Sequence, residues 1–226
     1  CVALKDMIEI CKIVGKKKDM KVYQKWLNEM VKNIKKHAWN GEWFTRAFHD
    51  NGKPIGVPTD KEGRVFINSQ SWAILAGVCD EEQKKKVFKV LDVDLNTKFG
   101  QRTLYPPFTK FNPMVGRISV AEPGFAENSG VYCHAVSFKL KADCIAGRGE
   151  EVYRGFKKIH PFYNDPDEVR GDPYVFSNCY YGPESLASGE VMHSWLTGTA
   201  TWMFEILTEW FIGVRGEFDG LVIDPV

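Results

Sequence analysis

Helix-period segments in consecutive pairs are the feature that most limits how this chain can fold. Apolar residues recur at helical spacing in three pairs of segments. These are residues 2–15 and 19–38, 67–78 and 80–95, and 128–147 and 149–160. Strands do not alternate with the helices as they do in a Rossmann-type fold, so we expect the helices to close around a common centre. A further helix is expected over residues 199–212.

Residues typical of helix ends support these boundaries. Gly15 and the lysines at 16–18 are typical of a helix C-terminus. Asn68 and Ser69 are expected to cap the helix that follows residue 66. The Asn-Ser-Gly segment 128–130 is expected to open a helix and to present free backbone N–H groups.

The two ends of the sequence predict that it is part of a longer protein. Residue 1 is Cys rather than Met, and the first helical pattern begins without a capping residue. Residues 220–226 are strand-like and have no evident neighbour to pair with. We therefore expect residues 216–226 to begin a β-rich segment.

Charge and cysteine usage argue against several classes of function. Thirty basic and 29 acidic residues give a net charge of +1, which argues against a nucleic-acid or membrane-surface partner. The six cysteines form no CxxC pair, so free thiols in a reducing cytoplasm are expected. No apolar run approaches the roughly 20 residues of a membrane span, and the histidines show no metal-ligand spacing.

Three long connections, residues 40–66, 99–127 and 161–194, are rich in Gly, Pro and aromatic residues. Loops of this length in a compact domain are usually functional, so we expect them to form the walls of a pocket. Flat aromatic rings suit the C–H faces of sugars, and the polar residues among them suit sugar hydroxyls. The aromatic candidates are Trp39, Trp43, Phe44, Tyr105, Phe108, Tyr174, Tyr180 and Tyr181. Ordinary core packing is the alternative.

The stretch HSWLTGTATWMF (residues 193–204) predicts an anion site. Thr197 and Gly198 precede a helix whose free N–H groups and dipole attract negative charge. Glycine allows an anion to approach the backbone, and the threonine hydroxyl adds a donor. Simple helix capping is the alternative. His134 is the candidate second partner for the anion, and a satisfied core histidine is the alternative there.

Five sequence motifs and the terminal segment occur in an order that resembles the cellobiose phosphorylase family, glycoside hydrolase family 94. They are WNGEWFTRAFHDNGKPIG (39–56), INSQSWAILAG (67–77), GRISVAEPGFAENSGVYCHAVSF (116–138), DPYVFSNCYYGPE (172–184), SWLTGTATWMF (194–204) and GLVIDP (220–225). The family includes cellobiose, chitobiose and cellobionic acid phosphorylases. The resemblance spans nearly the whole chain.

The resemblance implies a mainly α fold, with residues 1–215 as the C-terminal half of an (α/α)6 barrel. It also implies that inorganic phosphate, a co-substrate rather than a cofactor, cleaves a β-linked disaccharide or short oligosaccharide with inversion to give an α-sugar 1-phosphate. On the family pattern His134, Thr197 and Gly198 match phosphate-binding positions, and Glu127 matches a sugar-binding acid. A homodimer is a further expectation from the family.

The general acid is expected outside this chain. The resemblance places it in a DWND-like motif, which residues 1–226 lack. We expect the Asp upstream of Cys1, in a missing N-terminal part of the same protein, and expect residues 1–226 alone to be inactive.

Four positions depart from the cellobiose-specific pattern: Arg117, Ala121, Ala126 and Asn178. Arg117 would pair with a sugar-acid carboxylate, as in cellobionic acid, or form an ordinary loop salt bridge. Ala121 would leave room for the acetamido group of chitobiose. Both substrates stay open, with plain cellobiose the weakest match.

Two functions of other classes remain as alternatives. A glycoside hydrolase on the same helical barrel would need a carboxylate that activates water in place of the phosphate cluster. A non-catalytic carbohydrate-binding fragment would keep the aromatic walls but would not need His134 beside Thr197.

Overall fold

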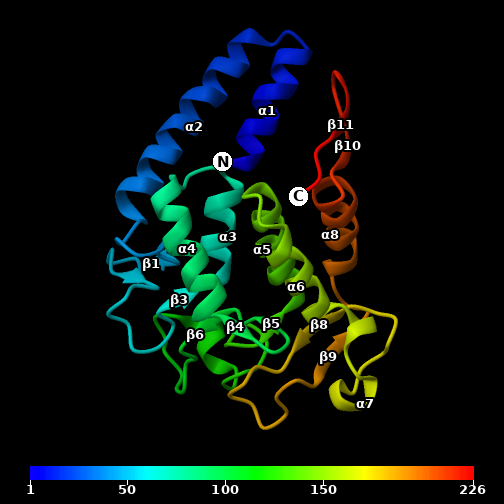
Figure 1. The fold of residues 1–226 in the computed structure, drawn as a ribbon. Coiled ribbons are helices and arrows are strands. Elements are labelled where there is room, and N and C mark those ends of the chain that lie inside the picture. The colour runs from blue at the N-terminus through cyan, green and yellow to red at the C-terminus, as the bar shows by residue number, and fades with distance from the viewer.

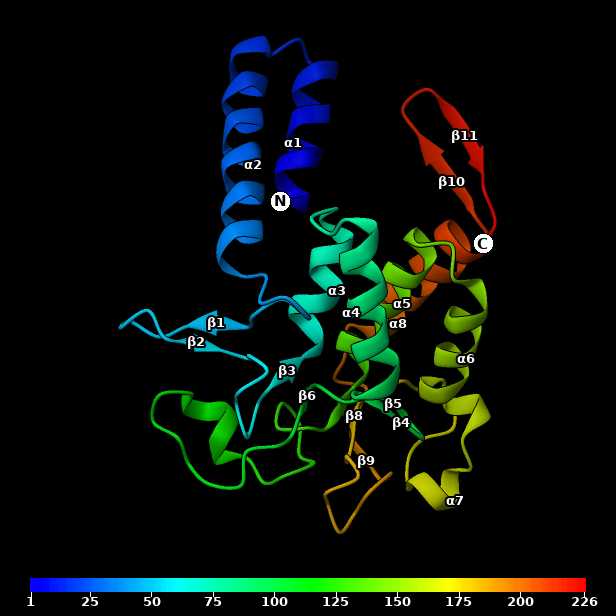
Figure 2. The ribbon, with the colours of Figure 1, turned by 60° about the vertical axis from the view of Figure 1, so that its left-hand side comes forward.

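A computed structural model describes all of residues 1–226 and shows a mainly helical chain (Figure 1). Helices α3, α4, α5, α6 and α8 stand side by side, and the short strands gather mostly at one end of them. The α1–α2 hairpin extends beyond the other helices in both ribbon views (Figure 2). No helix combines the length and the apolar character that crossing a bilayer requires.

The expected helical pairs are confirmed. The helices are α1 Val2–Ile13, α2 Lys17–His37, α3 Ile67–Leu75, α4 Glu81–Val93, α5 Cys133–Ile145, α6 Gly149–Ile159, the short α7 Pro166–Val169, and α8 Thr199–Glu205. α8 continues as a π-helical segment, Ile206–Phe211. Asp80 caps α4, since its carboxylate accepts the Gln83 N–H and the Gln83 side chain accepts the Asp80 N–H.

The start of α5 differs from the prediction. Residues 128–130 do not open this helix, because Val131–Tyr132 form strand β7 and the helix begins only at Cys133. Ser129 has a left-handed backbone with φ of 73°, and the Asn128 side chain is buried and hydrogen-bonded. The expected N–H donors of a helix start at residues 128–130 are therefore wrong.

The start of α3 also differs. Phe66 occupies the N-cap position, and no side chain caps the helix. Asn68 and Ser69 lie inside the first turn, so the prediction that they cap the helix is wrong.

The strands are short and antiparallel. They are β1 Ala47–Phe48, β2 Pro54–Ile55, β3 Val65–Phe66, β4 Asn96–Thr97, β5 Gly100–Gln101, β6 Leu104–Tyr105, β7 Val131–Tyr132, β8 Ser177–Tyr180, β9 Val191–Ser194, β10 Val214–Glu217 and β11 Gly220–Ile223. β7, β8 and β9 form a three-stranded sheet, and the other strands pair two by two. Two 3₁₀ helices, η1 Gly116–Val120 and η2 Pro161–Tyr163, lie in the long connections.

The end of the chain forms a hairpin. β11 pairs with β10 from Val214↔Ile223 to Glu217↔Gly220, so the expectation that this strand has no neighbour is wrong. The expected division after residue 215 falls inside β10.

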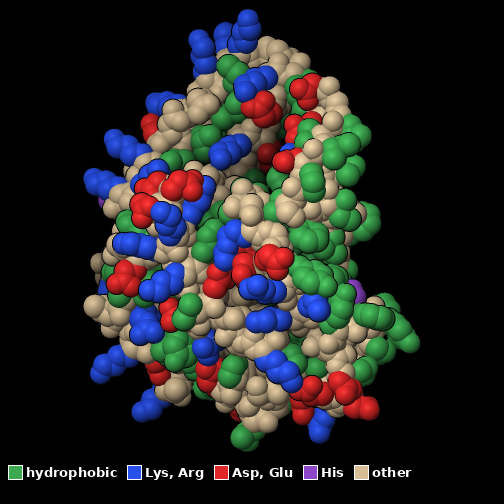
Figure 3. All heavy atoms as spheres, in the orientation of Figure 1, with side chains coloured by type: hydrophobic (Ala, Val, Ile, Leu, Met, Phe, Trp, Pro, Cys, Tyr) green, Lys and Arg blue, Asp and Glu red, His purple; other side chains and the backbone are tan.

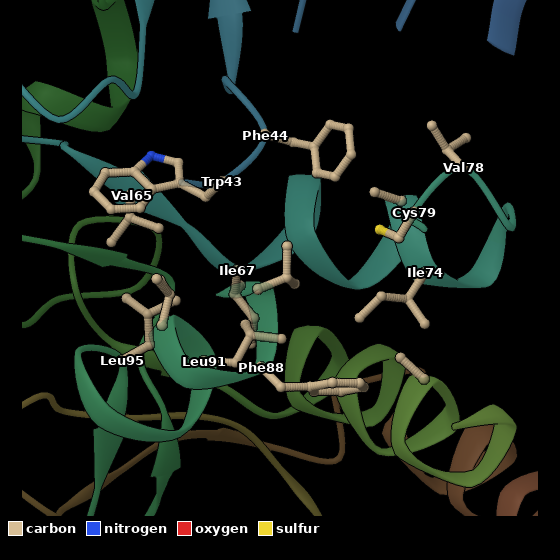
Figure 4. Close-up of a cluster of buried hydrophobic side chains, with 14 of the residues drawn as sticks. Trp43, Phe44, Val65, Ile67, Ile74, Val78, Cys79, Phe88, Leu91 and Leu95 are labelled. Carbon is tan, nitrogen blue, oxygen red and sulfur yellow. The ribbon is translucent and has the colours of Figure 1, made fainter. Parts of the chain in front are cut away.

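Two clusters of buried apolar side chains form most of the core. One lies around α3 and α4 and includes Trp43, Phe44 and Leu91 (Figure 4). The other surrounds α5 and α6 and includes Tyr180. Burial of the apolar side chains of α3 to α6 against one another supplies the main driving force for this arrangement.

Half of the expected sugar-binding aromatics belong to the core. Trp43, Phe44, Phe108 and Tyr180 are buried, as the alternative of core packing has it, although the first three also border surface cavities. Trp39, Tyr105 and Tyr181 are half-buried, and Tyr174 is 90% exposed. The Trp43 indole N–H donates to the carbonyls of Gly56 and Arg64, which satisfies its polar atom inside the core.

Charged groups are distributed without a dominant sign. Lys and Arg are interspersed with Asp and Glu over the face shown in Figure 3. One ionic cluster is buried between α4 and α5, where Lys139 Nζ lies 2.7 Å from Asp143 Oδ2 and 3.0 Å from Asp92 Oδ1. Arg148 joins it at 2.9 Å from Asp143 Oδ1. All six cysteines are free thiols, as expected, and five of them are buried.

Candidate functional site

His134 and Gly198 come into direct contact, although 64 positions separate them in the sequence. His134 is the second residue of α5, and Gly198 is the N-cap residue of α8. A Cβ atom on Gly198 would lie 2.9 Å from His134 Cε1 and 3.2 Å from Nε2. Because the φ of Gly198 is −82°, its backbone suits any residue, and the close approach of the ring is what requires glycine.

Thr197 participates in the turn that leads into α8. Its Oγ1 accepts the Thr199 backbone N–H at 3.2 Å and lies 2.6 Å from Thr199 Oγ1. Gly198 is the N-cap residue and no side chain caps α8, so the Thr197 hydroxyl makes a local turn contact instead of the simple helix cap that was the alternative. The Thr197 hydroxyl is thereby fixed next to Gly198.

The His134 imidazole has no polar partner in the protein. Its Nε2 is buried and makes no hydrogen bond. The ring lies against aromatic rings, with centroids 4.7 Å from Phe138 and 5.9 Å from Trp202. Burial lowers the pKa of His134 below its usual value because it removes water from the charged form. A bound anion would have the opposite effect on this pKa.

A cavity of about 230 Å³ opens beside the imidazole. Its walls are formed by Asn68, Thr103, Glu127, Tyr132, His134, Ala135 and Phe138. These side chains place an imidazole, a carboxylate, an amide and two hydroxyls around one small volume. A concave site with a few converging polar groups is typical of ligand-binding pockets.

Glu127 is the one acidic residue of this cavity. Its side chain is exposed and forms no ion pair, while its backbone carbonyl accepts the Thr103 hydroxyl at 2.9 Å. Thr103 Oγ1 also accepts the Ser129 N–H at 3.1 Å, so one hydroxyl fixes the chain on both sides of Asn128. The position of Glu127 is thus set by Thr103.

A second set of contacts also holds the segment that contains Glu127 and Ser129. Ser129 Oγ donates to Glu184 Oε2 at 3.1 Å, and Arg102 binds Glu184 Oε1 at 2.6 Å. The Arg102 guanidinium also lies 4.0 Å from the centre of the Tyr105 ring. No local sequence pattern singles out Arg102 or Glu184, although Glu184 ends the motif DPYVFSNCYYGPE.

Asn178 connects the cavity to the turn before α8. Its Nδ2 donates to the Leu196 carbonyl at 2.6 Å and to the Tyr132 hydroxyl at 3.3 Å. Leu196 directly precedes Thr197, and Tyr132 lines the cavity. The Asn178 amide therefore connects strand β8 both to the cavity wall at Tyr132 and to the turn before α8 at Leu196.

Arg117 and Ala121 lie outside the His134 cavity. Arg117 is exposed on η1 and forms no ion pair, so the alternative of a loop salt bridge is wrong. Ala121 lines a separate surface cavity of about 380 Å³ together with Phe108 and Lys110. Its carbonyl accepts a hydrogen bond of 2.7 Å from the Asn128 amide, which fixes that wall.

Comparison with protein families identifies the chain. Residues 1–213 match the model described as "Glycosyl hydrolase 94 superfamily, catalytic domain". Because this match covers more than nine-tenths of the sequence, the chain belongs to that family, as the resemblance of its motifs predicted.

Three relatives are phosphorylases of different disaccharides. Solabiose phosphorylase of Paenibacillus borealis is 37% identical over 194 residues, which are 85% of this chain and 25% of the relative. The 3-O-beta-D-glucopyranosyl-beta-D-glucuronide phosphorylase of the same organism is 36% identical over 228 residues, 99% of this chain and 29% of the relative. Cellobionic acid phosphorylase of Neurospora crassa is 35% identical over 195 residues, 84% and 25% of the two chains.

The chain spans about a quarter of the length of these relatives. A solved structure of a family 78 rhamnosidase from Bacillus sp. GL1 is similar in fold, with a TM-score of 0.58 over 96% of this chain and 19% of that chain. The sequence identity there is 14%, so this likeness concerns the fold alone.

Proposed function

We propose that residues 1–226 are the phosphate-binding portion of an inverting glycoside phosphorylase. The whole protein would cleave a β-linked disaccharide or short oligosaccharide with inorganic phosphate and release an α-sugar 1-phosphate. The observation that supports this most directly is the unpartnered Nε2 of His134, held against Gly198 at the start of α8 and beside a cavity that contains Glu127.

The proposed reaction needs an acid but no general base. A phosphate oxygen attacks the anomeric carbon, the glycosidic C–O bond breaks, and a carboxylic acid gives its proton to the departing oxygen. Phosphate takes the place of the water that an inverting hydrolase must activate. Residues 1–226 contain no DWND motif, so the proposal assigns the proton to an Asp outside them.

Within this mechanism the residues of the chain bind and orient the phosphate. His134 Nε2 would contact one phosphate oxygen, and the Gly198 and Thr197 segment would supply N–H and O–H donors. Negative charge next to the imidazole would favour its protonated form, which then pairs with the phosphate. Glu127 would accept hydrogen bonds from sugar hydroxyls.

We place the helices in one half of an (α/α)6 barrel. The consecutive pairs α1–α2, α3–α4 and α5–α6 support this arrangement. The likeness in fold to the rhamnosidase is consistent with it. We also place the protein in a reducing cytoplasm, which the six free thiols support.

A sugar acid is the acceptor that we propose. Arg117 offers an exposed guanidinium without an ion pair, and a guanidinium recognises a carboxylate through paired hydrogen bonds. Two of the relatives are named for a glucuronide and for cellobionic acid. An acetamido sugar, for which Ala121 would leave room, is the competing acceptor.

The complete protein tests the proposal with a set of β-linked disaccharides, each supplied with and without phosphate. We expect cleavage only with phosphate, and an α-sugar 1-phosphate detected by NMR. Equal cleavage in both conditions would show a hydrolase. Saccharide binding without any cleavage would show a carbohydrate-binding protein.

A further inference from the structure

Asn68 is the one polar side chain in the first turn of α3 that has no hydrogen-bond partner. Its Oδ1 is buried and unpaired. Both neighbours are engaged: Ser69 Oγ donates to the Phe66 carbonyl, and the Gln70 amide bonds to the N–H and the carbonyl of Phe44. Buried amide oxygens are nearly always paired in proteins, because an unpaired one destabilises the fold.

Asn68, which carries the unpaired oxygen, lines the wall of the His134 cavity. Asn68 comes from α3 and His134 from α5, two helices that pack side by side (Figure 1). The two residues that carry these unpartnered buried atoms, Asn68 with Oδ1 and His134 with Nε2, therefore line the same cavity of about 230 Å³. A bound ligand would satisfy both of them.

Asn68 Oδ1 and His134 Nε2 differ in hydrogen-bonding chemistry, so we expect them to bind different groups of the substrates. An amide oxygen only accepts hydrogen bonds, and phosphate near neutral pH, with at most one or two O–H groups on four oxygens, also mainly accepts them. A sugar hydroxyl can donate to Asn68 Oδ1, and the exposed carboxylate of Glu127 in the same cavity suits a second hydroxyl.

We infer that Asn68 is a sugar-binding residue that accepts a hydrogen bond from a ring hydroxyl of the saccharide next to the phosphate. The inference rests on the proposed phosphorylase function and adds a contact on the sugar side of the anion site. α3 presents the amide from a rigid element, which suits a residue that sets orientation.

Asn68→Leu in the complete protein tests this contact, because leucine has a similar size but no polar atom. We expect kcat/KM for the disaccharide to fall about ten- to hundred-fold, the range for one buried hydroxyl left unpaired. The KM for phosphate should change by less than about three-fold, within the spread of an indirect effect. The melting temperature should stay equal or rise, because an unpaired buried amide is removed.

Ser69→Ala is the matched control, since it alters the next residue of the same turn and its side chain lines a different cavity. This variant should retain the kinetics of the wild type. If Asn68→Leu lost activity together with melting temperature, and Ser69→Ala did the same, Asn68 would be a structural residue and the inference would be wrong.

A set of mono-deoxy sugar 1-phosphates, assayed in the synthetic direction, identifies the hydroxyl. One analogue should react slowly with the wild type and show no further loss with Asn68→Leu, because the contact is already absent. An equal loss for every analogue, or no effect of Asn68→Leu on an active enzyme, would overturn the inference alone. A wild-type protein without phosphate-dependent cleavage would overturn the proposed function and the inference with it.

Discussion

At the residue scale, the missing side chain of Gly198 sets the distance between α5 and α8. The backbone of Gly198 has an ordinary φ of −82°, so alanine would be tolerated there if space allowed. The His134 ring occupies that space, since an added Cβ would lie 2.9 Å from its Cε1. A single methyl group therefore tests whether the contact matters for anion binding.

We expect Gly198→Ala to displace His134 and to weaken phosphate binding about ten-fold or more, the effect of losing one hydrogen bond to a charged group. The overpacked contact should also reduce the free energy of unfolding by about 1–3 kcal/mol. Phosphate titration of the complete protein measures the first effect, and denaturant unfolding measures the second.

Gly216→Ala serves as the control, because a Cβ at that exposed position on β10 meets nothing within 4 Å. Equal phosphate affinity in Gly198→Ala and the wild type would contradict the assigned role of Gly198.

Individual site residues were partly predictable from the sequence. Thr197 and Gly198 were candidates because a Thr-Gly pair ahead of a helical pattern indicates either an anion site or simple helix capping, and the structure places Gly198 against His134. His134 needed the family resemblance, since a lone histidine on a helix gives no signal of its own. Asn68 was interpreted as a cap, because an Asn next to a helix start usually is one. Only the tertiary structure shows that its oxygen has no partner.

At the element scale, the β7–β8–β9 sheet positions the turn that precedes α8. Asn178 on β8 donates to the Leu196 carbonyl, while His193 and Trp195 adopt left-handed backbones with φ of 53° and 71°. Such conformations are costly for residues other than glycine and persist only where the surroundings enforce them. The Asn178 amide is one of the contacts that enforce this turn.

We expect Asn178→Asp to raise the KM for phosphate several-fold, because the carboxylate keeps the size of the amide but cannot donate to the Leu196 carbonyl. A several-fold rise in this KM corresponds to about 1 kcal/mol, which is the typical contribution of one hydrogen bond. Steady-state kinetics with phosphate and sugar varied separately measure it. A larger effect on the sugar KM than on the phosphate KM would indicate that Asn178 touches the saccharide instead.

Element boundaries were predicted less well than element types. The helical period of residues 133–145 was recognised, but the pattern was extended back to residue 128 across strand β7. Pairing with β8, distant in sequence, fixes those residues, and a local pattern does not contain that information. The terminal hairpin was missed although Asp219-Gly220, a pair common in turns, lies where Phe218 and Asp219 connect β10 to β11.

At the scale of the whole molecule, the helical pairs explain why the candidate site lies between elements far apart in sequence. α3, α5 and α8 are brought together by the two core clusters. Asn68 and His134 thereby line one small cavity, and Gly198 contacts the His134 ring. The aromatic walls could be predicted only in part for the same reason, because sequence alone does not show which rings become buried in the core.

Substrate choice depends on the arrangement of the whole molecule, because the candidate acceptor residues Arg117 and Ala121 lie outside the cavity that holds His134. We expect Arg117→Ala in the complete protein to reduce kcat/KM for a sugar-acid acceptor by about ten-fold or more, since a charge-assisted pair is lost. Neutral acceptors should react as before. A parallel comparison of cellobionic acid, chitobiose and cellobiose measures this, and an unchanged preference would remove Arg117 from acceptor recognition.

The pKa of His134 with and without phosphate tests the central claim most directly. Burial holds the pKa of His134 in the free site below its ordinary value of about 6.5. As the pH falls, the imidazole is therefore protonated in the unfolded chain before it is protonated in the folded protein. The contribution of His134 to the free energy of unfolding consequently falls as the pH drops below about 6.5. NMR of the labelled imidazole in the complete protein, titrated in both states, reports the value. Our account predicts a low pKa that rises clearly when phosphate saturates the site. A pKa that saturating phosphate leaves unchanged would contradict it.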